Sequence, residues 1–217
     1  MAGPPYDTDD PDPVLFHHWE AYISSHSTIF NQKWSGTAPH FELNYGIIPN
    51  MQLHIITPLA YTLDERQIHT YGYGDTEIGI KYRFLKETKY TPEVGTFIIT
   101  EIPSGNSKEG LGSGSTQLFI PVWVQKTIGK LTAYGGYGQW VKSNTYKNNR
   151  FAGIQAQYQF TPKFSFGAEL YCNTNNNITD SRFNLGCIID LNKINHILIS
   201  AGKSFNSNNS MECYIGV

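Results

Sequence analysis

The sequence predicts an all-β protein, a transmembrane antiparallel up-and-down β-barrel of about twelve strands. Apolar and polar residues alternate along the 217-residue chain in segments of about ten residues, the length of a tilted membrane strand. The links between these segments alternate between long and short. Charged residues make up 16% and aromatic residues 14% of the chain, which suits a protein with a lipid-facing surface.

The composition excludes several other classes. Sixteen Lys and Arg stand against eighteen Asp and Glu, so no basic surface is available for nucleic acid. The longest apolar stretches, such as 118–124, are about seven residues long and contain Pro121, whereas a membrane-spanning helix needs about twenty residues. The three cysteines have no metal-ligand spacing, and the seven histidines show no pair of zinc ligands on one strand face. We therefore expect no cofactor, no metal site and no disulfide framework.

Residues 1–17 form an acidic, proline-rich tail ahead of the predicted barrel, 18–217. The tail carries Asp7, Asp9, Asp10 and Asp12 between prolines, a composition that neither packs nor pairs as a strand. A solvated tail, a Ca²⁺ site built from the Asp cluster, and a plug folded into the lumen are three alternatives. The first residues have no apolar export signal, so we expect a mature form from which a signal peptide was removed.

The predicted strands follow in order from the period-two pattern. They are 18–27, 40–47, 51–59, 74–85, 93–102, 115–126, 130–141, 150–160, 164–173, 182–190, 196–205 and 211–217. The segment 75–84 is the clearest, with Thr76, Ile78 and Ile80 on one face and Asp75 and Glu77 on the other. Pro49-Asn50 marks the turn between the second and third strands.

The predicted links separate into two classes by position. Links rich in Asn, Ser and Gly follow the odd-numbered strands, at 28–39, 60–73, 103–114, 142–149, 174–181 and 206–210. Short links follow the even-numbered strands, at 48–50, 86–92, 127–129, 161–163 and 191–195. Outer-membrane barrels have this asymmetry because their periplasmic turns are tight and their external loops extended. An even number of strands also places both ends of the barrel on the short-turn side.

Charged side chains on the lipid face of such a barrel cost about 2–4 kcal/mol at the midplane, so we expect the polar face of each strand to line the lumen. The predicted lumen residues are Glu42, Asn44, Gln52, His54, Asp75, Glu77, Lys81, Arg83, Glu101, Gln117, Trp123, Gln155, Gln157 and Glu169. Their mixed charges indicate either a solute path or a salt-bridge network that holds the barrel rigid. No catalytic residue is predicted.

One part of the predicted inner face is apolar. If Glu93, Glu101, Gln117 and Gln125 face inward, then so do Phe97, Ile99, Phe119 and Trp123. Such a patch would suit a small hydrophobic or aromatic molecule, and a one-residue slip in register would turn it toward lipid instead.

Several sequence blocks resemble a known family. They are Gly3-Pro4-Pro5 with Thr8-Asp9-Asp10-Pro11, His40-Phe41-Glu42-Leu43-Asn44-Tyr45-Gly46 with Asn50-Met51-Gln52-Leu53, the run 72–83 (GYGDTEIGIKYR), Ile102-Pro103-Ser104-Gly105-Asn106, and Leu111-Gly112-Ser113-Gly114-Ser115-Thr116. The chain resembles, over most of its length, the outer-membrane transporter family of the meta-pathway of phenol degradation. The family more often has Thr where Ser104 stands. The resemblance implies a barrel in the bacterial outer membrane and carries no catalytic residues.

The functional expectation is a non-enzymatic, passive transporter or channel for small molecules, hydrophobic or aromatic ones included. Its partners are outer-membrane lipid and a small solute, with no nucleic acid, and the oligomeric state is not predicted. One alternative is a structural or surface-interaction barrel with a closed lumen. Another is an outer-membrane phospholipase, for which Ser24 and His26 have a suitable i, i+2 spacing.

Overall fold

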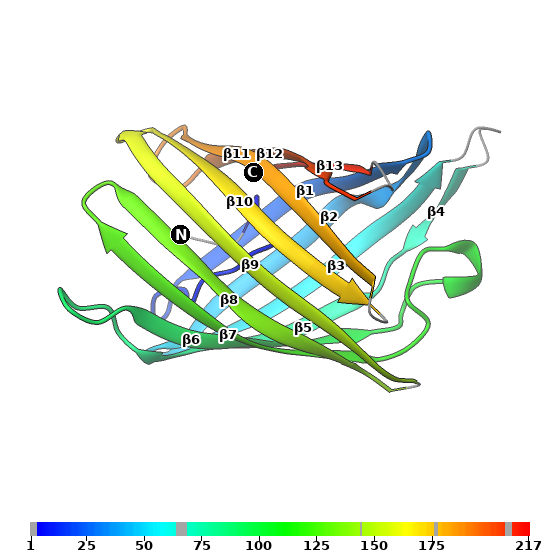
Figure 1. Ribbon diagram of the computed structural model, residues 1–217, viewed down its shortest axis with the longest axis horizontal. Coiled ribbons are helices and arrows are strands. Elements are labelled where there is room, and N and C mark those ends of the chain that lie inside the picture. The colour runs from blue at the N-terminus through cyan, green and yellow to red at the C-terminus, as the bar shows by residue number, and fades with distance from the viewer. Residues whose placement is uncertain (1–3, 64–68, 144, 176–177, 207–209) are drawn as a thin grey trace.

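The computed structural model describes residues 4–63, 69–143, 145–175, 178–206 and 210–217. Over these residues the chain forms one continuous sheet of thirteen antiparallel strands that closes on itself (Figure 1). Their bounds are β1 Trp19–Phe30, β2 Lys33–Ile48, β3 Met51–Leu63, β4 His69–Tyr73, β5 Thr76–Leu85, β6 Glu93–Ile102, β7 Gln117–Ile128, β8 Leu131–Lys142, β9 Thr145–Thr161, β10 Phe164–Asn175, β11 Ile178–Asp190, β12 His196–Ser204 and β13 Met211–Gly216. The first strand β1 pairs with both β2 and β13, which closes the ring.

The thirteen strands occupy twelve positions around the barrel, because β4 and β5 are two parts of one interrupted strand. Both pair with β3, β4 against its second half and β5 against its first half. Gly74 and Asp75 separate the two parts. The prediction of a closed antiparallel barrel of about twelve strands is therefore confirmed.

The barrel has its polarity reversed relative to a water-soluble protein, with apolar side chains outside and polar side chains inside. On β3, Leu53 and Ile55 are exposed, whereas Gln52 and His54 are buried. The same alternation continues on the other strands, and it gives the molecule an apolar outer belt. Closure gives every strand except β4 a paired neighbour on both sides, as a hydrocarbon environment demands.

Aromatic side chains cluster on the outer surface near the short turns. Trp19 stacks on Tyr45 with ring centroids 4.2 Å apart, and Tyr158, Phe160 and Phe164 form a second group. Amphipathic rings at this level suit a membrane interface.

Four of the predicted long loops are wrong in their extent, because the strands continue into them. β2 begins at Lys33, so the predicted link 28–39 reduces to a turn at Asn31 and Gln32. Similar extensions of β3, β8, β9, β10 and β11 shorten the predicted links 60–73, 142–149 and 174–181, of which residues 64–68, 144 and 176–177 lie outside the described part of the chain. Strand pairing uses backbone groups, so polar segments beyond the apolar belt pair as well as apolar ones.

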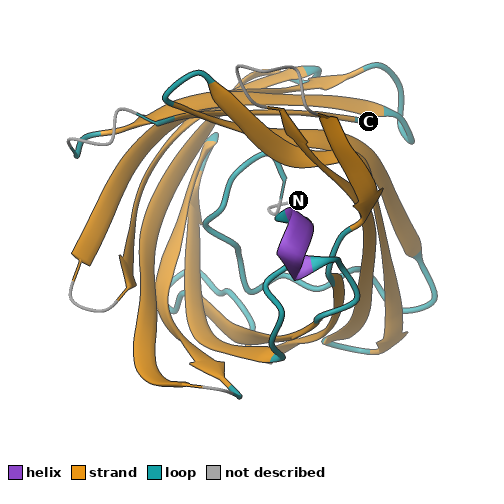
Figure 2. Ribbon diagram, turned by 90° about the vertical axis from the view of Figure 1, so that its right-hand side faces the viewer, coloured by secondary structure: helices purple, strands orange, loops and turns teal. Residues whose placement is uncertain are grey.

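The link between β6 and β7 does remain a long loop. It contains a single 3₁₀ turn, η1 (Ser107–Glu109), which projects inside the ring of strands when the barrel is viewed from the end that carries β4 (Figure 2). Within the described residues, no helical segment has the length and apolar character needed to cross a membrane.

Candidate functional site

The N-terminal tail lies inside the barrel, and it divides the lumen (Figure 2). Where the tail leaves β1, the His17 N–H donates to the Gly46 carbonyl at 2.8 Å, and Phe16 and Gly46 form an isolated parallel β-bridge. Further in, the Val14 N–H donates to Gln52 Oε1 at 2.8 Å. The tail thus enters along β2 and β3 and continues across the interior.

Two cationic side chains of the barrel wall form ion pairs with the acidic side chains of the tail. Lys81 Nζ on β5 donates to Asp9 Oδ1 at 2.9 Å and to Asp10 Oδ1 at 3.2 Å. Arg83, two residues along the same strand face, forms an ion pair with Asp12. Burial raises the pKa of the Asp9 carboxyl above its ordinary value, although the Lys81 ammonium acts to lower it. These ion pairs compensate charges that would otherwise be buried alone.

The far end of the tail is held by the opposite wall. The Glu169 carboxylate on β10 accepts the N–H groups of Asp7, at 3.3 Å, and of Thr8. Asn184 Nδ2 on β11 donates to the same carboxylate at 2.9 Å. Ser200 Oγ on β12 donates to the Pro5 carbonyl at 2.6 Å.

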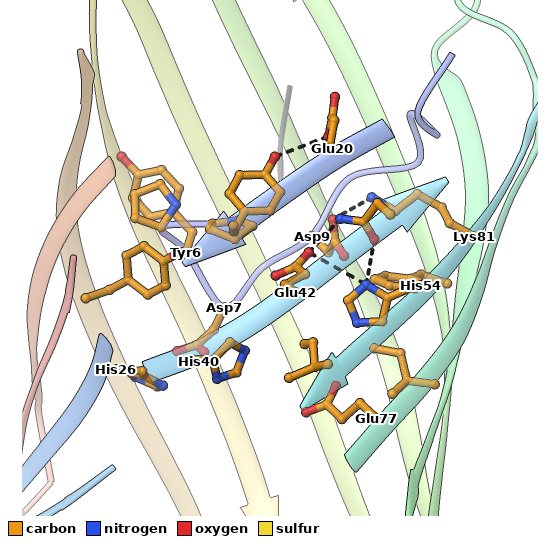
Figure 3. Close-up of a pocket in the computed structure, with 18 of the residues that line it drawn as sticks. Tyr6, Asp7, Asp9, Glu20, His26, His40, Glu42, His54, Glu77 and Lys81 are labelled. Atoms are coloured by element: carbon orange, nitrogen blue, oxygen red, sulfur yellow. Dashed lines mark hydrogen bonds and ion pairs between the residues drawn. The ribbon is translucent and has the colours of Figure 1, made fainter. Parts of the chain in front are cut away.

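A cavity of about 530 Å³ remains beside the tail, against β1, β2, β3 and β5 (Figure 3). Six of the predicted lumen residues line it, namely Glu42, Asn44, Gln52, His54, Glu77 and Lys81. His54 Nδ1 lies 2.7 Å from Asn44 Oδ1, and the His54 ring meets the Phe97 ring edge-on with centroids 4.9 Å apart. The apolar residues Ile56, Phe97 and Ile99 line the cavity beside these polar groups.

The lining of the cavity holds more acidic than basic side chains. Glu20, Glu42 and Glu77 all line it, and within the described residues none of the three forms an ion pair with Lys or Arg. Glu42 accepts a hydrogen bond from Asn44 Nδ2 at 2.8 Å, and Glu20 accepts one from the Tyr22 hydroxyl at 3.2 Å. In the strand register Ile56 pairs with Glu42 on one side and with Glu77 on the other, so the backbones of the two glutamates lie about 10 Å apart, across two strand spacings.

The other predicted lumen residues lie elsewhere. Glu101 and Gln117 form a hydrogen bond of 2.8 Å and line a smaller cavity of about 250 Å³. Gln155 and Glu169 are buried on the wall behind the tail, and Gln157 is half-buried on the same face of β9.

Asp75 is in the link between β4 and β5, and it lines neither of these two cavities. Its carboxylate accepts the Gly105 N–H at 2.9 Å and the Ser113 N–H at 2.5 Å, both in the β6–β7 loop. Partial burial acts to raise the pKa of Asp75, but the hydrogen bonds from Ser113 and Gly105 outweigh it and leave the pKa below its ordinary value. Asp75 therefore holds the long β6–β7 loop at the break between β4 and β5.

Apolar residues of β6, β7, β9 and β10 form an aromatic cluster inside the barrel. Its members are Phe97, Phe119, Trp123, Phe151 and Tyr171, with Ile99 and Trp140 packed against it. Trp123 is only 1% exposed, and its ring lies 5.8 Å from that of Phe151. The predicted lumen residue Trp123 is therefore enclosed by other rings, and only the Phe97 and Ile99 edge of the cluster reaches the larger cavity.

Sequence reasoning did not foresee that the Asp cluster of the tail and the cations of β5 are partners. It also missed a set of inward-facing glycines on which the tail lies, Gly95, Gly153, Gly167 and Gly186. The sequence does contain an indication of these contacts. Glycine recurs at inward positions of several strands, whereas an open lumen would be lined there by larger polar side chains.

No protein-family model matches the chain, and no curated protein is similar enough in sequence to match it. In fold, the chain is similar to the COG4313 outer membrane channel from Pseudomonas putida F1, with a TM-score of 0.71 at 12% identity over 97% of this chain and 98% of that one. The chain has the fold of a bacterial outer-membrane channel.

Two further solved structures have this fold. The KdgM porin, in complex with disordered oligogalacturonate, has a TM-score of 0.60 at 11% identity over 90% of this chain and 96% of its own. The CymD monoaromatic hydrocarbon channel has a TM-score of 0.51 at 9% identity over 93% of this chain and 88% of its own. Oligogalacturonate and a monoaromatic hydrocarbon are named for the same fold, so the fold leaves the solute open.

Proposed function

We propose that this protein is a passive, non-enzymatic channel of the bacterial outer membrane for small molecules. The observation that carries the proposal is the cavity of about 530 Å³ inside a closed barrel with an apolar outer belt. The fold similarity to outer-membrane channels supports it.

The lining of the cavity favours cationic or neutral solutes with an apolar part. Glu20, Glu42 and Glu77 disfavour anions, because a like charge in a low-dielectric lumen repels them strongly. Phe97 and Ile99, on the neighbouring strand β6, provide an apolar surface beside them. The resemblance to the phenol-degradation transporter family agrees with an aromatic solute.

Planar-bilayer recordings test this proposal. In a KCl gradient the purified protein should carry single-channel currents whose reversal potential indicates preference for cations, and liposomes should admit small aromatic amines faster than aromatic carboxylates. Complete absence of current and of solute uptake, with the tail in place and with it removed after folding, would leave the closed-lumen structural barrel as the better reading.

The tail favours that alternative in one respect, because it crosses the interior of the barrel (Figure 2). The phospholipase alternative has weaker support, since Ser24 Oγ is buried and, within the described residues, His26 does not hydrogen-bond to it.

A further inference from the structure

The contacts of the tail include its backbone as well as its side chains. Gln52 Oε1 accepts the Val14 N–H, Glu169 accepts two successive N–H groups, and Ser200 Oγ donates to the Pro5 carbonyl. Glu169 is 1% exposed and Gln52 4% exposed. Buried side chains placed to bind main-chain groups recognise an extended peptide, whatever its side chains are.

Charge adds selectivity for acidic residues. Lys81 contacts two consecutive tail carboxylates, and Arg83 contacts a third two residues later. Lys81 is 3% exposed, so its ammonium is desolvated and depends on these partners. A peptide without these carboxylates would leave that ammonium buried and unpaired.

The wall is also hollowed along the course of the tail. A Cβ atom added at Gly153 would lie 2.1 Å from Thr8 Oγ1, and one added at Gly95 would lie 2.9 Å from Pro11 Cβ. A Cβ at Gly186 would meet the Tyr6 ring and hydroxyl at 2.9 Å. Side chains are absent at these inward positions where the tail occupies the space.

We infer that the inner wall of the barrel is a binding groove for an acidic, extended peptide, and that the tail occupies it as a reversible plug. The binding site itself is independent of any transport activity. Its role as a plug rests on the proposed channel function.

The tail joins the barrel through an exposed segment, with Leu15 68% and Phe16 44% exposed at the short-turn end. No strand has to unpair for residues 4–14 to leave. A protease recognition sequence inserted between Leu15 and Phe16 would therefore allow the full chain to fold first and be cut afterwards.

The experiment measures exchange of the cut tail. After cleavage in detergent, the barrel is washed and titrated with a fluorescent synthetic peptide of residues 2–14, and binding is followed by anisotropy. The peptide should bind saturably, and a peptide with Asp9→Asn, Asp10→Asn and Asp12→Asn should bind at least about tenfold more weakly. Equal affinity of the two peptides, or no exchange of the cut tail, would overturn the inference.

A variant of the wall provides an independent arm. Gly153→Ala should weaken binding of the unmodified peptide, because the new methyl group takes the place of the Thr8 hydroxyl. Gln157→Ala, four residues away on the same face of β9, should bind the peptide as the parent barrel does. The Gly153→Ala barrel must still migrate on gels as a folded barrel. If it then binds the peptide with parental affinity, the inference that the inward glycines form the peptide groove is wrong.

Bilayer recordings on the same cut barrel separate the two proposals. Currents that rise when the cut tail is washed out and fall on addition of peptide at the short-turn end support the plug. Specific peptide binding without currents in either state keeps the groove and refutes the channel. Currents without peptide binding keep the channel and refute the groove.

Discussion

At the scale of single residues, Glu42 and Glu77 differ from the lumen carboxylates that have a cationic partner. Asp9, Asp10 and Asp12 of the tail are paired with Lys81 and Arg83, and Glu212 is paired with Arg182 at 2.5 Å. Glu42 and Glu77 face the cavity from β2 and β5 and have no Lys or Arg partner within the described residues. Their carboxyl groups are therefore available to a permeating solute.

We predict that Glu77→Gln lowers the preference of the channel for cations, and that Glu42→Gln with Glu77→Gln lowers it further. The removal of these two charges reduces the negative potential that solutes meet. The measurement is the reversal potential in a KCl gradient. Glu109→Gln, in the exposed η1 turn, is the matched control. An unchanged reversal potential in the double variant would contradict the assignment of these residues.

Lys81→Gln should release the tail. Without the ammonium, Asp9 and Asp10 would stay buried as uncompensated charges, at a cost of about 3–5 kcal/mol. We expect faster proteolysis of the tail and a larger conductance, with the barrel still folded. Lys126→Gln removes a cation that pairs with Glu87 near the short turns, away from the tail, and should leave both measurements unchanged. A tail equally resistant to protease in both variants would argue against the clamp.

At the scale of elements, β4 and β5 differ from the other strands because together they form one interrupted strand. β6 ends at Ile102 opposite Thr76, so β4 pairs with β3 alone. The β6–β7 loop covers this part of the wall, with Leu111 buried close to Gly72. Asp75 holds the loop at Gly105 and Ser113, and it acts as a latch.

Asp75→Asn should loosen the β6–β7 loop without unfolding the barrel. An amide in place of the carboxylate weakens two hydrogen bonds to charge, each worth about 1.5–3 kcal/mol. Hydrogen exchange at the Gly105 and Ser113 amides should become at least about tenfold faster. Glu109→Gln, on the same loop, is the control, and equal protection in the two variants would refute the latch.

The latch also has a defined pH dependence. The folded pKa of Asp75 is lowered relative to its ordinary value of about 3.9. Its stabilisation is therefore complete above that value and is lost only as the pH falls through the lower folded pKa. Exchange protection of Gly105 and Ser113, corrected for intrinsic exchange rates, should not change between neutral pH and about pH 5 on this account.

At the scale of the whole molecule, the reversed polarity of the barrel determines where charge is tolerated. Ile154 and Gln157 lie on β9 and face opposite sides of the wall, with Ile154 61% exposed. We predict that Ile154→Lys lowers the free energy of unfolding in lipid by about 2–4 kcal/mol. Gln157→Lys, on the inner face, should cost much less. Denaturant titration in liposomes measures both, and equal costs would contradict the assignment of the outer face to lipid.

The local pattern of the sequence determined the strands, their faces and the short turns. Alternation of apolar and polar residues is read from neighbours two apart, and turn residues such as Pro49-Asn50 act locally. This information suffices for the barrel and for the inward direction of Glu42, His54 and Lys81. It does not predict the hairpin extensions, because strand pairs outside the apolar belt lose the alternation and keep only their backbone bonds.

Only the tertiary structure decided which lumen groups are partners. Lys81 and Asp9 are 72 residues apart, and Asp7 and Glu169 are 162 residues apart. Contacts over such separations form when the sheet closes and brings distant walls around one lumen, so no local pattern records them. The same closure places the acidic tail on the inner-face glycines, encloses Trp123 in an aromatic cluster, and leaves Glu42 and Glu77 facing an open cavity.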